Sequence, residues 1–275
     1  MRTARYLSPF VGAVAAIALA ACGDSPTGVT ASLYNDSTVT VDVATSAGDA
    51  AALAVETMAA NETAAGASAD LVAATAVFET NPTNTLTVTR ERTCLDAAGA
   101  VVAACSPFTS VRKIATRVTF NGSRSKTETT TGGNAATWIG AVHRVSNDTL
   151  RRNFNTATPA VETSRTHTDM TVGHDTTTFA EATNTRFMAE ASHDSIKAVV
   201  FNLPRTSNPF PVSGSIVRVD SVHVAITKAS KTETKDIVRV VTITFPPDAQ
   251  GNVVLTVNGK ICTLNLVTHK VSACH

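Results

Sequence analysis

The feature that most constrains the fold of this chain is an alternation of β-branched and polar residues over most of its length. From Thr85 onward, runs rich in Thr, Val and Ile recur about every 10–15 residues, separated by Gly, Asn and Pro. In one run, Ile114, Val118 and Phe120 share a face that excludes Arg117. Such runs predict strands at Ile114–Phe120, Ala136–Val145, Thr149–Phe154, Thr163–Val172, Thr176–Phe179, Ser195–Asn202, Ser215–Thr227, Ile237–Phe245 and Asn252–Val257.

Short strands joined by turns, with no helices between them, predict an antiparallel sheet. We therefore expect a mainly β fold, an antiparallel meander that forms a sandwich or a partly open half-barrel. The segment 203–214 contains Pro204, Pro209 and Pro211 and interrupts the pattern. It is either a long crossing loop or a sub-boundary between two parts of the sheet.

One hairpin is predicted down to its register. Asn258-Gly259 is a preferred two-residue turn because both positions tolerate positive φ. Pairing across this turn sets Leu255 against Cys262 and Val253 against Leu264. One face of the hairpin is then apolar beyond the turn.

The region before Thr85 has a different character. Thr38–Val43 alternates at period two and predicts a first strand, and the Ala-rich Ser46–Ala60 predicts the one N-terminal helix. Residues 22–37 are mostly small and polar and predict a flexible tether. The β-rich domain is accordingly expected to cover residues 38–275.

The cysteines predict two local disulfides. Cys94 and Cys105 flank one candidate turn, and Cys262 and Cys274 flank another. Cysteines that face each other on antiparallel strands are close to disulfide distance, so we expect the pairs Cys94–Cys105 and Cys262–Cys274. The chain has no Cys-x-x-Cys pair, which argues against a structural zinc site.

The first 21 residues have the layout of an export signal. Two arginines precede an apolar stretch that ends at Ala21 and is too short to span a bilayer. Leu19-Ala20-Ala21-Cys22 closes this stretch and resembles the lipobox of bacterial lipoprotein signal peptides. The resemblance implies that residues 1–21 are a signal peptide, cleaved before Cys22, and that Cys22 carries palmitate and other acyl chains. An ordinary secretory signal with an incidental cysteine is the alternative.

The same resemblance implies a location. Gly23, rather than an aspartate, directly follows Cys22. Within the lipoprotein family this favours the outer membrane, so we expect a lipid-anchored protein of the cell envelope that faces the periplasm or the surface. Two or more acyl chains give a stable anchor, and the membrane partner is thus the lipid itself.

Charge excludes one class of partner. Loss of residues 1–21 would lower Lys+Arg from 23 to 21 against 22 Asp+Glu, a formal charge near −1. Nucleic-acid binding needs a concentrated basic surface, so no nucleic-acid partner is expected. Aromatic residues make up only 5% of the chain, which predicts a thin core or one spread along extended sheets.

Few residues suggest chemistry. His167 and Asp169 would share one face of a strand, and with His174 they are the weak candidates for metal ligands. Histidines scattered over a Thr-rich surface produce such neighbours anyway, so we expect no metal, no cofactor and no catalytic residue. Basic residues recur in the middle of the chain, and we expect them on a solvated face: Arg90, Arg92, Arg112, Lys113, Arg117, Arg144, Arg151 and Arg152. The alternative is a row of arginines on one sheet face that meets lipid headgroups or anionic polysaccharide. An envelope protein, a lipid or a polysaccharide is thus the expected kind of partner.

The resulting expectation is a lipid-anchored envelope protein with a non-catalytic binding or structural role. A helix followed by a long meander is also similar to half-barrels that carry lipids or lipoproteins, which is the alternative. A metal-dependent hydrolase built on His167, Asp169 and His174 is the third hypothesis.

Overall fold

The computed structural model describes residues 32–64, 85–129, 135–181, 183–205, 210–272 and 274–275. The chain separates into two compact units, Met1–Ala31 and Ser32–His275, and every described element belongs to the second. The predicted signal peptide, Cys22 and residues 22–31 of the predicted tether therefore lie outside the described residues. Among the described helices, none is both long and apolar enough to cross a membrane.

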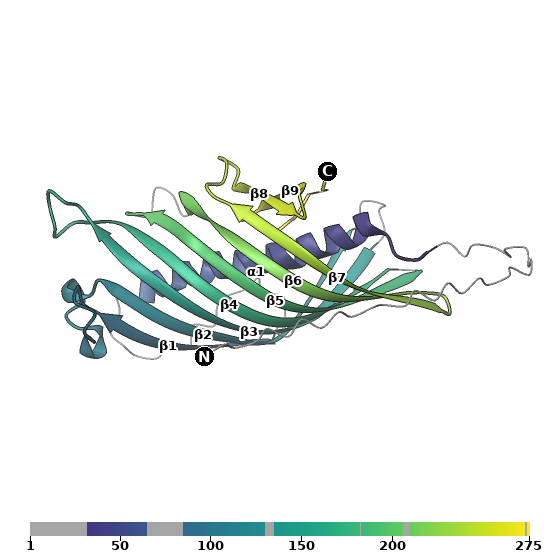
Figure 1. The fold of residues 1–275 in the computed structure, drawn as a ribbon, viewed down its shortest axis with the longest axis horizontal. Coiled ribbons are helices and arrows are strands. Elements are labelled where there is room, and N and C mark those ends of the chain that lie inside the picture. Colours follow the sequence, from purple (N-terminus) through teal and green to yellow (C-terminus); the bar gives the residue numbers. More distant parts are fainter. Residues whose placement is uncertain (1–31, 65–84, 130–134, 182, 206–209, 273) are drawn as a thin grey trace, which may run out of the picture. The chain divides into compact units, whose positions relative to one another are not determined.

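The second unit is one antiparallel sheet in which each strand pairs with the next along the chain (Figure 1). The predicted mainly β meander with one helix is confirmed, and its strands form a single open sheet. Two short 3₁₀ helices, Ala103–Cys105 and Phe108–Ser110, lie between the first two strands. The strands are β1 (Thr85–Leu95), β2 (Lys113–Thr129), β3 (Ala135–Phe154), β4 (Glu162–Ala180), β5 (Asn184–Asn202), β6 (Ser213–Lys228), β7 (Lys231–Thr244), β8 (Asn252–Val257) and β9 (Lys260–Asn265).

The helix α1 (Asp36–Ala64) is longer than predicted and begins earlier. The predicted strand Thr38–Val43 is wrong, because these residues form its first turns. Asn35 Oδ1 accepts hydrogen bonds from the backbone N–H groups of Ser37 and Thr38, which caps the helix. The predicted tether therefore ends before residue 36, while the predicted helix Ser46–Ala60 lies within α1.

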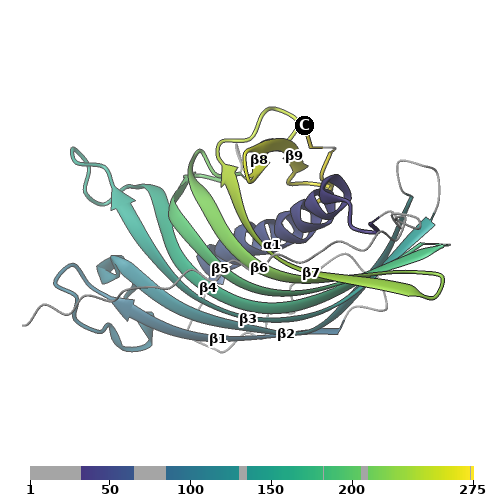
Figure 2. The ribbon, with the colours of Figure 1, turned by 45° about the vertical axis from the view of Figure 1, so that its right-hand side comes forward.

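The sheet curves around α1, which lies in its hollow, and the β8–β9 hairpin packs against the helix from the other side (Figure 2). The main apolar core forms at this contact. Val39 and Val43 of α1 are fully buried with Leu255 of β8 and Leu264 of β9. Tertiary burial of two valines on one helical face thus outweighs their β propensity.

The long strands merge runs that the sequence pattern separated. The predicted runs Thr163–Val172 and Thr176–Phe179 are both part of β4, which continues through Gly173. β3 similarly joins the two runs predicted between 136 and 154. β5 and β6 pair directly on either side of segment 203–214, so the sheet is continuous across the predicted sub-boundary; residues 206–209 lie outside the described part.

Both predicted disulfides are present, Cys94–Cys105 and Cys262–Cys274. They close short loops, with sequence separations of 11 and 12 residues. The predicted hairpin register is confirmed as well, since Leu255 pairs with Cys262 and Val253 with Leu264.

Candidate functional site

The concave face of the sheet carries an unusual number of buried charges. Alternate residues of β3 to β6 point toward α1, and many of them are ionisable rather than apolar. Buried charges need partners, because the cost of removing them from water is several kcal/mol each. We call the following set the buried ion network: Arg144, Asp148, His167, Asp169, Asp175, Glu190, Asp194, Arg218 and Asp220.

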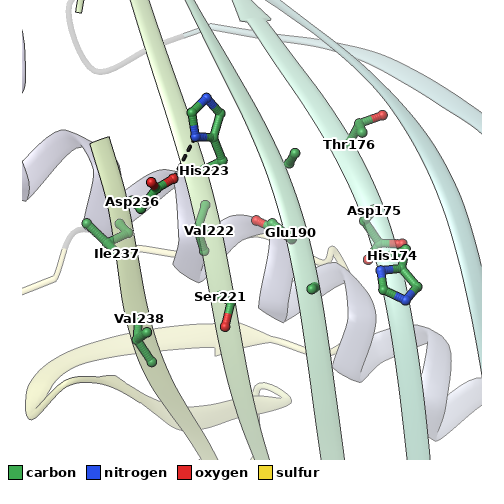
Figure 3. A pocket seen from close by; sticks show the side chains of 12 residues that line it. His174, Asp175, Thr176, Glu190, Ser221, Val222, His223, Asp236, Ile237 and Val238 are labelled. Carbon is green, nitrogen blue, oxygen red and sulfur yellow. Dashed lines mark hydrogen bonds and ion pairs between the residues drawn. The ribbon is translucent and has the colours of Figure 1, made fainter. Parts of the chain in front are cut away.

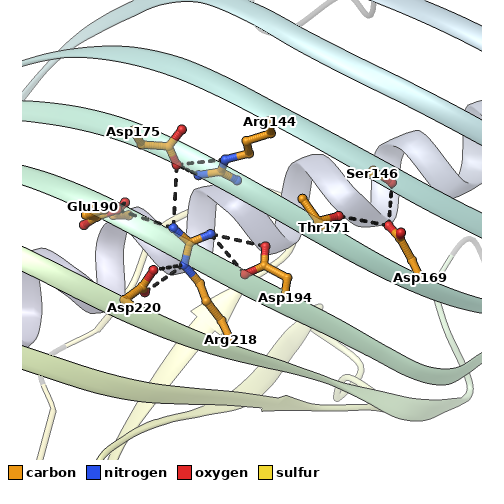
Figure 4. Close-up of polar contacts among 10 residues, drawn as sticks. Arg144, Ser146, Asp169, Thr171, Asp175, Glu190, Asp194, Arg218 and Asp220 are labelled. Carbon is orange, nitrogen blue, oxygen red and sulfur yellow. Dashed lines mark hydrogen bonds and ion pairs between the residues drawn. The ribbon is translucent and has the colours of Figure 1, made fainter.

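Arg218 on β6 is the centre of this network (Figure 4). Its Nε lies 2.7 Å from Asp220 Oδ1, and its Nη1 lies 3.2 Å from Asp194 Oδ2. Its Nη2 lies 3.4 Å from Glu190 Oε2 and 3.6 Å from Asp175 Oδ2. Burial alone would lower the pKa of Arg218, but the carboxylates of Asp194, Asp220 and Glu190 raise it. Arg218 is therefore permanently charged.

A second guanidinium joins the network from β3. Arg144 Nε donates to Asp175 Oδ2 at 2.8 Å, and both side chains are almost fully buried. The expectation that Arg144 lies on a solvated face is thus wrong. Val142, Arg144 and Ser146 lie two positions apart on β3, so their side chains share one face of the strand, and all three are buried.

Polar contacts also attach α1 to the sheet. Asp42 accepts hydrogen bonds from Arg186 on β5, the shorter at 2.6 Å to Nε. Ser46 Oγ donates to Glu190 Oε2 at 2.6 Å, and Asn61 Nδ2 donates to an oxygen of Asp148 at 3.3 Å. The helix is held along its length by polar groups as well as by the apolar core.

The weak metal candidates do not converge. His167 and Asp169 share the inner face of β4 as predicted, but His174 is exposed on the opposite face. His167 Nδ1 lies 2.9 Å from Asp148 Oδ2, so its ring is engaged in the network. Within the described ranges, no three His, Cys, Asp or Glu side chains are grouped so that they could hold a metal ion.

Two carboxyl groups of the network hold protons unusually tightly. Burial raises the pKa of Glu190 to about 7, although the charge of Arg218 opposes the shift. Burial also raises the pKa of Asp169 to about 6, against the hydrogen bond from Ser146, and the charge of Asp148 adds to the rise. Because both groups lie inside the fold, their protonation is linked to its stability.

The convex face has a different composition and carries a groove of about 570 Å³. Two neighbouring cross-strand rows line it (Figure 3). In both rows, small side chains on the middle strands lie between larger ones, which leaves a hollow. The first row is His174, Ala191, Ser221 and Val238; the second is Thr176, Ala189, His223 and Asp236.

The groove holds one ion pair, in which His223 Nδ1 lies 2.6 Å from Asp236 Oδ1. Both partners are well exposed, so solvent screens the pair. Exposed apolar side chains continue beyond the groove, including Val172, Val219 and Val240 in the next cross-strand positions. The outer face is thus hollowed, weakly charged and partly apolar.

Comparison with protein-family models, with curated proteins and with solved structures finds no match.

Proposed function

We propose that the chain is a lipid-anchored protein of the cell envelope whose β-rich unit has a non-catalytic binding or structural role. The resemblance of Leu19–Cys22 to a lipobox supports the anchor. The two disulfides fit a compartment outside the cytoplasm, where thiols are oxidised.

The observation that supports the non-catalytic role is that the ionisable groups on the concave face are buried and paired with one another. Catalysis needs acids, bases or nucleophiles that can reach a substrate. In the buried ion network these groups instead face one another beneath α1, and Arg218 alone engages four carboxylates. Their role is to hold the helix in the sheet.

Contact with a partner would then take place on the convex face. The groove beside His174 and His223 provides a concave surface there, and the neighbouring valines provide apolar contact area. Exposed apolar patches with polar edges are typical of interaction sites. The partner is expected to be largely uncharged where it touches this face.

Labelling with radioactive palmitate tests the anchor. We expect the wild-type chain to incorporate label in a bacterial host that processes lipoproteins, and the variant Cys22→Ala to incorporate none. A matched variant, Cys262→Ala with Cys274→Ala, should still be labelled. Equal labelling of wild type and Cys22→Ala would contradict the proposal.

The lipid-carrier alternative predicts an apolar cavity beneath α1. The described concave face is filled by the apolar core and, over β3 to β6, by carboxylates and guanidinium groups; an acyl chain placed against these charges would leave them without water or partners. Native mass spectrometry of the chain released from its membrane separates the two functions. A co-purified lipid bound inside the β-rich unit would favour the carrier.

A further inference from the structure

Two histidines lie directly opposite each other on the convex face of the sheet. In the register of β3 with β4, His143 is paired with His174. The residues before and after each histidine are buried, whereas both histidines are exposed, so both imidazole rings project outward from the same face. Directly opposed residues on antiparallel strands have Cβ atoms about 4.5–5.5 Å apart. The two rings are therefore close neighbours.

Neither ring is engaged by another side chain. Within the described residues, His143 and His174 make no hydrogen bond or ion pair. Three other histidines each lie next to a carboxylate: His167 beside Asp148, His223 beside Asp236 and His269 beside Glu56. The nitrogen atoms of His143 and His174 are thus available to a ligand.

The surroundings of this histidine pair do not repel a cation. Asn121 faces His143 from β2, and Ala191 faces His174 from β5. The residues that flank the pair along the two strands on the same face are also uncharged: Ala141, Val145, Val172 and Thr176. Because Ala191 is small, the side of the pair that faces β5 is open.

We propose that His143 and His174 together bind one divalent transition-metal ion, with Cu²⁺ bound more tightly than Ni²⁺ or Zn²⁺. Neutral imidazole is a preferred ligand of all three ions, and Cu²⁺ is the strongest binder in the series. Because the sheet holds both histidines in place, coordination by one ring brings the second to the ion at a high effective concentration.

The site has two protein ligands. No third His, Cys, Asp or Glu side chain joins them among the described residues. Water would complete the coordination, so the affinity is expected to be lower than that of a structural zinc site with four protein ligands. His174 also lines the convex groove, and a bound ion would lie at the edge of that groove (Figure 3). There it could accept an oxygen or nitrogen atom from a molecule that occupies the groove.

Titration with CuSO₄ tests the proposal. The full chain, without an affinity tag, is solubilised in detergent, freed of metal with a chelator and titrated at pH about 7.5, where ordinary imidazole is mostly unprotonated. We expect one Cu²⁺ to bind most tightly, and pulsed electron paramagnetic resonance to show two imidazoles coordinated to it. Binding should weaken as the pH falls, because a histidine must lose its proton to coordinate a metal.

Variants locate the ion. His143→Gln and His174→Gln should each weaken Cu²⁺ binding at least about tenfold, the loss seen even for residues that only support a metal ligand, and should leave the signal of a single imidazole. His193→Gln and His223→Gln are the matched controls, because both remove an exposed imidazole from the same face. Both controls should bind the ion as the wild type does. Circular dichroism checks that all four variants are folded.

A one-imidazole signal in the wild type, or unchanged affinity in either His143→Gln or His174→Gln, would overturn the proposal. A loss confined to His223→Gln would assign the ion to the pair of His223 and Asp236 and would overturn it as well. The site does not depend on the lipid anchor. Cys22→Ala, which removes the one cysteine outside the two disulfides, should therefore bind Cu²⁺ with the affinity of the wild type.

Discussion

Some single buried charged residues contribute strongly to the stability of the fold, and Arg218 is the clearest case. It is fully buried and lies among four carboxylates. Because so many charges share one partner, the loss of that partner cannot be compensated by any one neighbour. The stability of the interior therefore depends on charged residues that a pattern of hydrophobicity does not identify as buried.

Replacing Arg218 by Met should destabilise the protein by about 3–5 kcal/mol, because it leaves Asp194, Asp220 and Glu190 without their shared cation. Urea unfolding followed by circular dichroism measures the change. Lys260→Met is the control: Lys260 pairs with Asp36 at the surface, and the loss should be under about 1 kcal/mol. Similar losses in the two variants would show that the network is not a stability determinant.

The titration of Asp169 and Glu190 predicts an unusual pH dependence. Their pKa values in the folded state, about 6 and about 7, lie above those of an unfolded chain, so the folded state binds more protons between about pH 4 and pH 7. Stability should therefore rise by roughly 1–4 kcal/mol as the pH falls from 8 to 5.

The rise should end below about pH 4.5. There Glu162 loses its charge; burial opposes that charge, but hydrogen bonds from Arg165 and Arg152 keep the pKa of Glu162 low. Urea midpoints at pH 5, 6, 7 and 8, with chelator present and ionic strength fixed, check the profile. Asp169→Asn should flatten part of it, and a wild-type profile that is flat or rises toward pH 8 would contradict the assignment.

At the scale of elements, β5 shows how one irregular position changes a strand. Ile196 and Val199 both point inward although an odd number of positions separates them. The register with β4 and β6 shifts at this point, and Ala198 takes a φ of 48°. Such a bulge restores the inward phase after one extra residue. Gly214 lies directly against it.

Gly214→Ala should cost roughly 2–4 kcal/mol, because φ is +106° and a Cβ would lie 2.5 Å from the carbonyl oxygen of Ala198. Gly259 is the matched control: its φ is +86°, but no heavy atom lies within 4 Å of the Cβ position. Gly259→Ala should cost only about 1 kcal/mol for the backbone conformation. Equal costs, measured by thermal unfolding, would mean that the bulge relaxes around the new methyl group.

The elements that the sequence predicts well are those whose geometry is local. The Asn258-Gly259 turn fixes the register of its hairpin. The disulfide Cys94–Cys105 likewise joins residues that are close in the sequence, so its pairing could also be predicted from local spacing. The strand predicted at Thr38–Val43 failed because Val39 and Val43 satisfy a helical period as well as a strand period. The sequence pattern separates Thr163–Val172 from Thr176–Phe179, but β4 continues through Gly173. A Cβ at Gly173 would lie 2.6 Å from Ser192 Oγ, so the glycine allows β4 and β5 to pack closely there.

The site was harder to predict, because it depends on register between strands far apart in sequence. Arg218 and Asp220 alternate in phase with the buried Ile216 and Val222, and that phase is a signal that they point inward. Nothing local indicates that Asp175 on β4 would lie within reach of Arg218. The face of each charge could be predicted, whereas its partner could not.

At the scale of the whole unit, the packing is uneven. Among the described residues, the largest apolar cluster joins α1 to β4–β9, whereas the β1–β3 end has two small clusters around Val118 and Ile114. Local stability follows the density of buried apolar contacts. We therefore expect the two ends of the sheet to open with different free energies.

Hydrogen exchange followed by mass spectrometry checks this asymmetry. β2 and β6 are both paired on two sides, so a difference between them reports packing rather than an unpaired edge. Amides of β2 should exchange at least about tenfold faster than those of β6, which corresponds to a difference of about 1.4 kcal/mol or more. Equal protection would indicate that the unit opens only as a whole.

The consecutive pairing of the strands also has a consequence for how a newly made chain acquires its shape. Each strand pairs with the strand that precedes it in the sequence, so a chain synthesised from its amino end can form the sheet one hairpin at a time. The helix α1, however, precedes every strand of the sheet in the sequence, and part of its apolar face packs against Leu255 of β8 and Leu264 of β9, which follow the other strands. Until β8 and β9 have been synthesised, this apolar part of the α1 surface stays exposed. A chaperone that covers it would therefore act while strands β1 to β7 are being made.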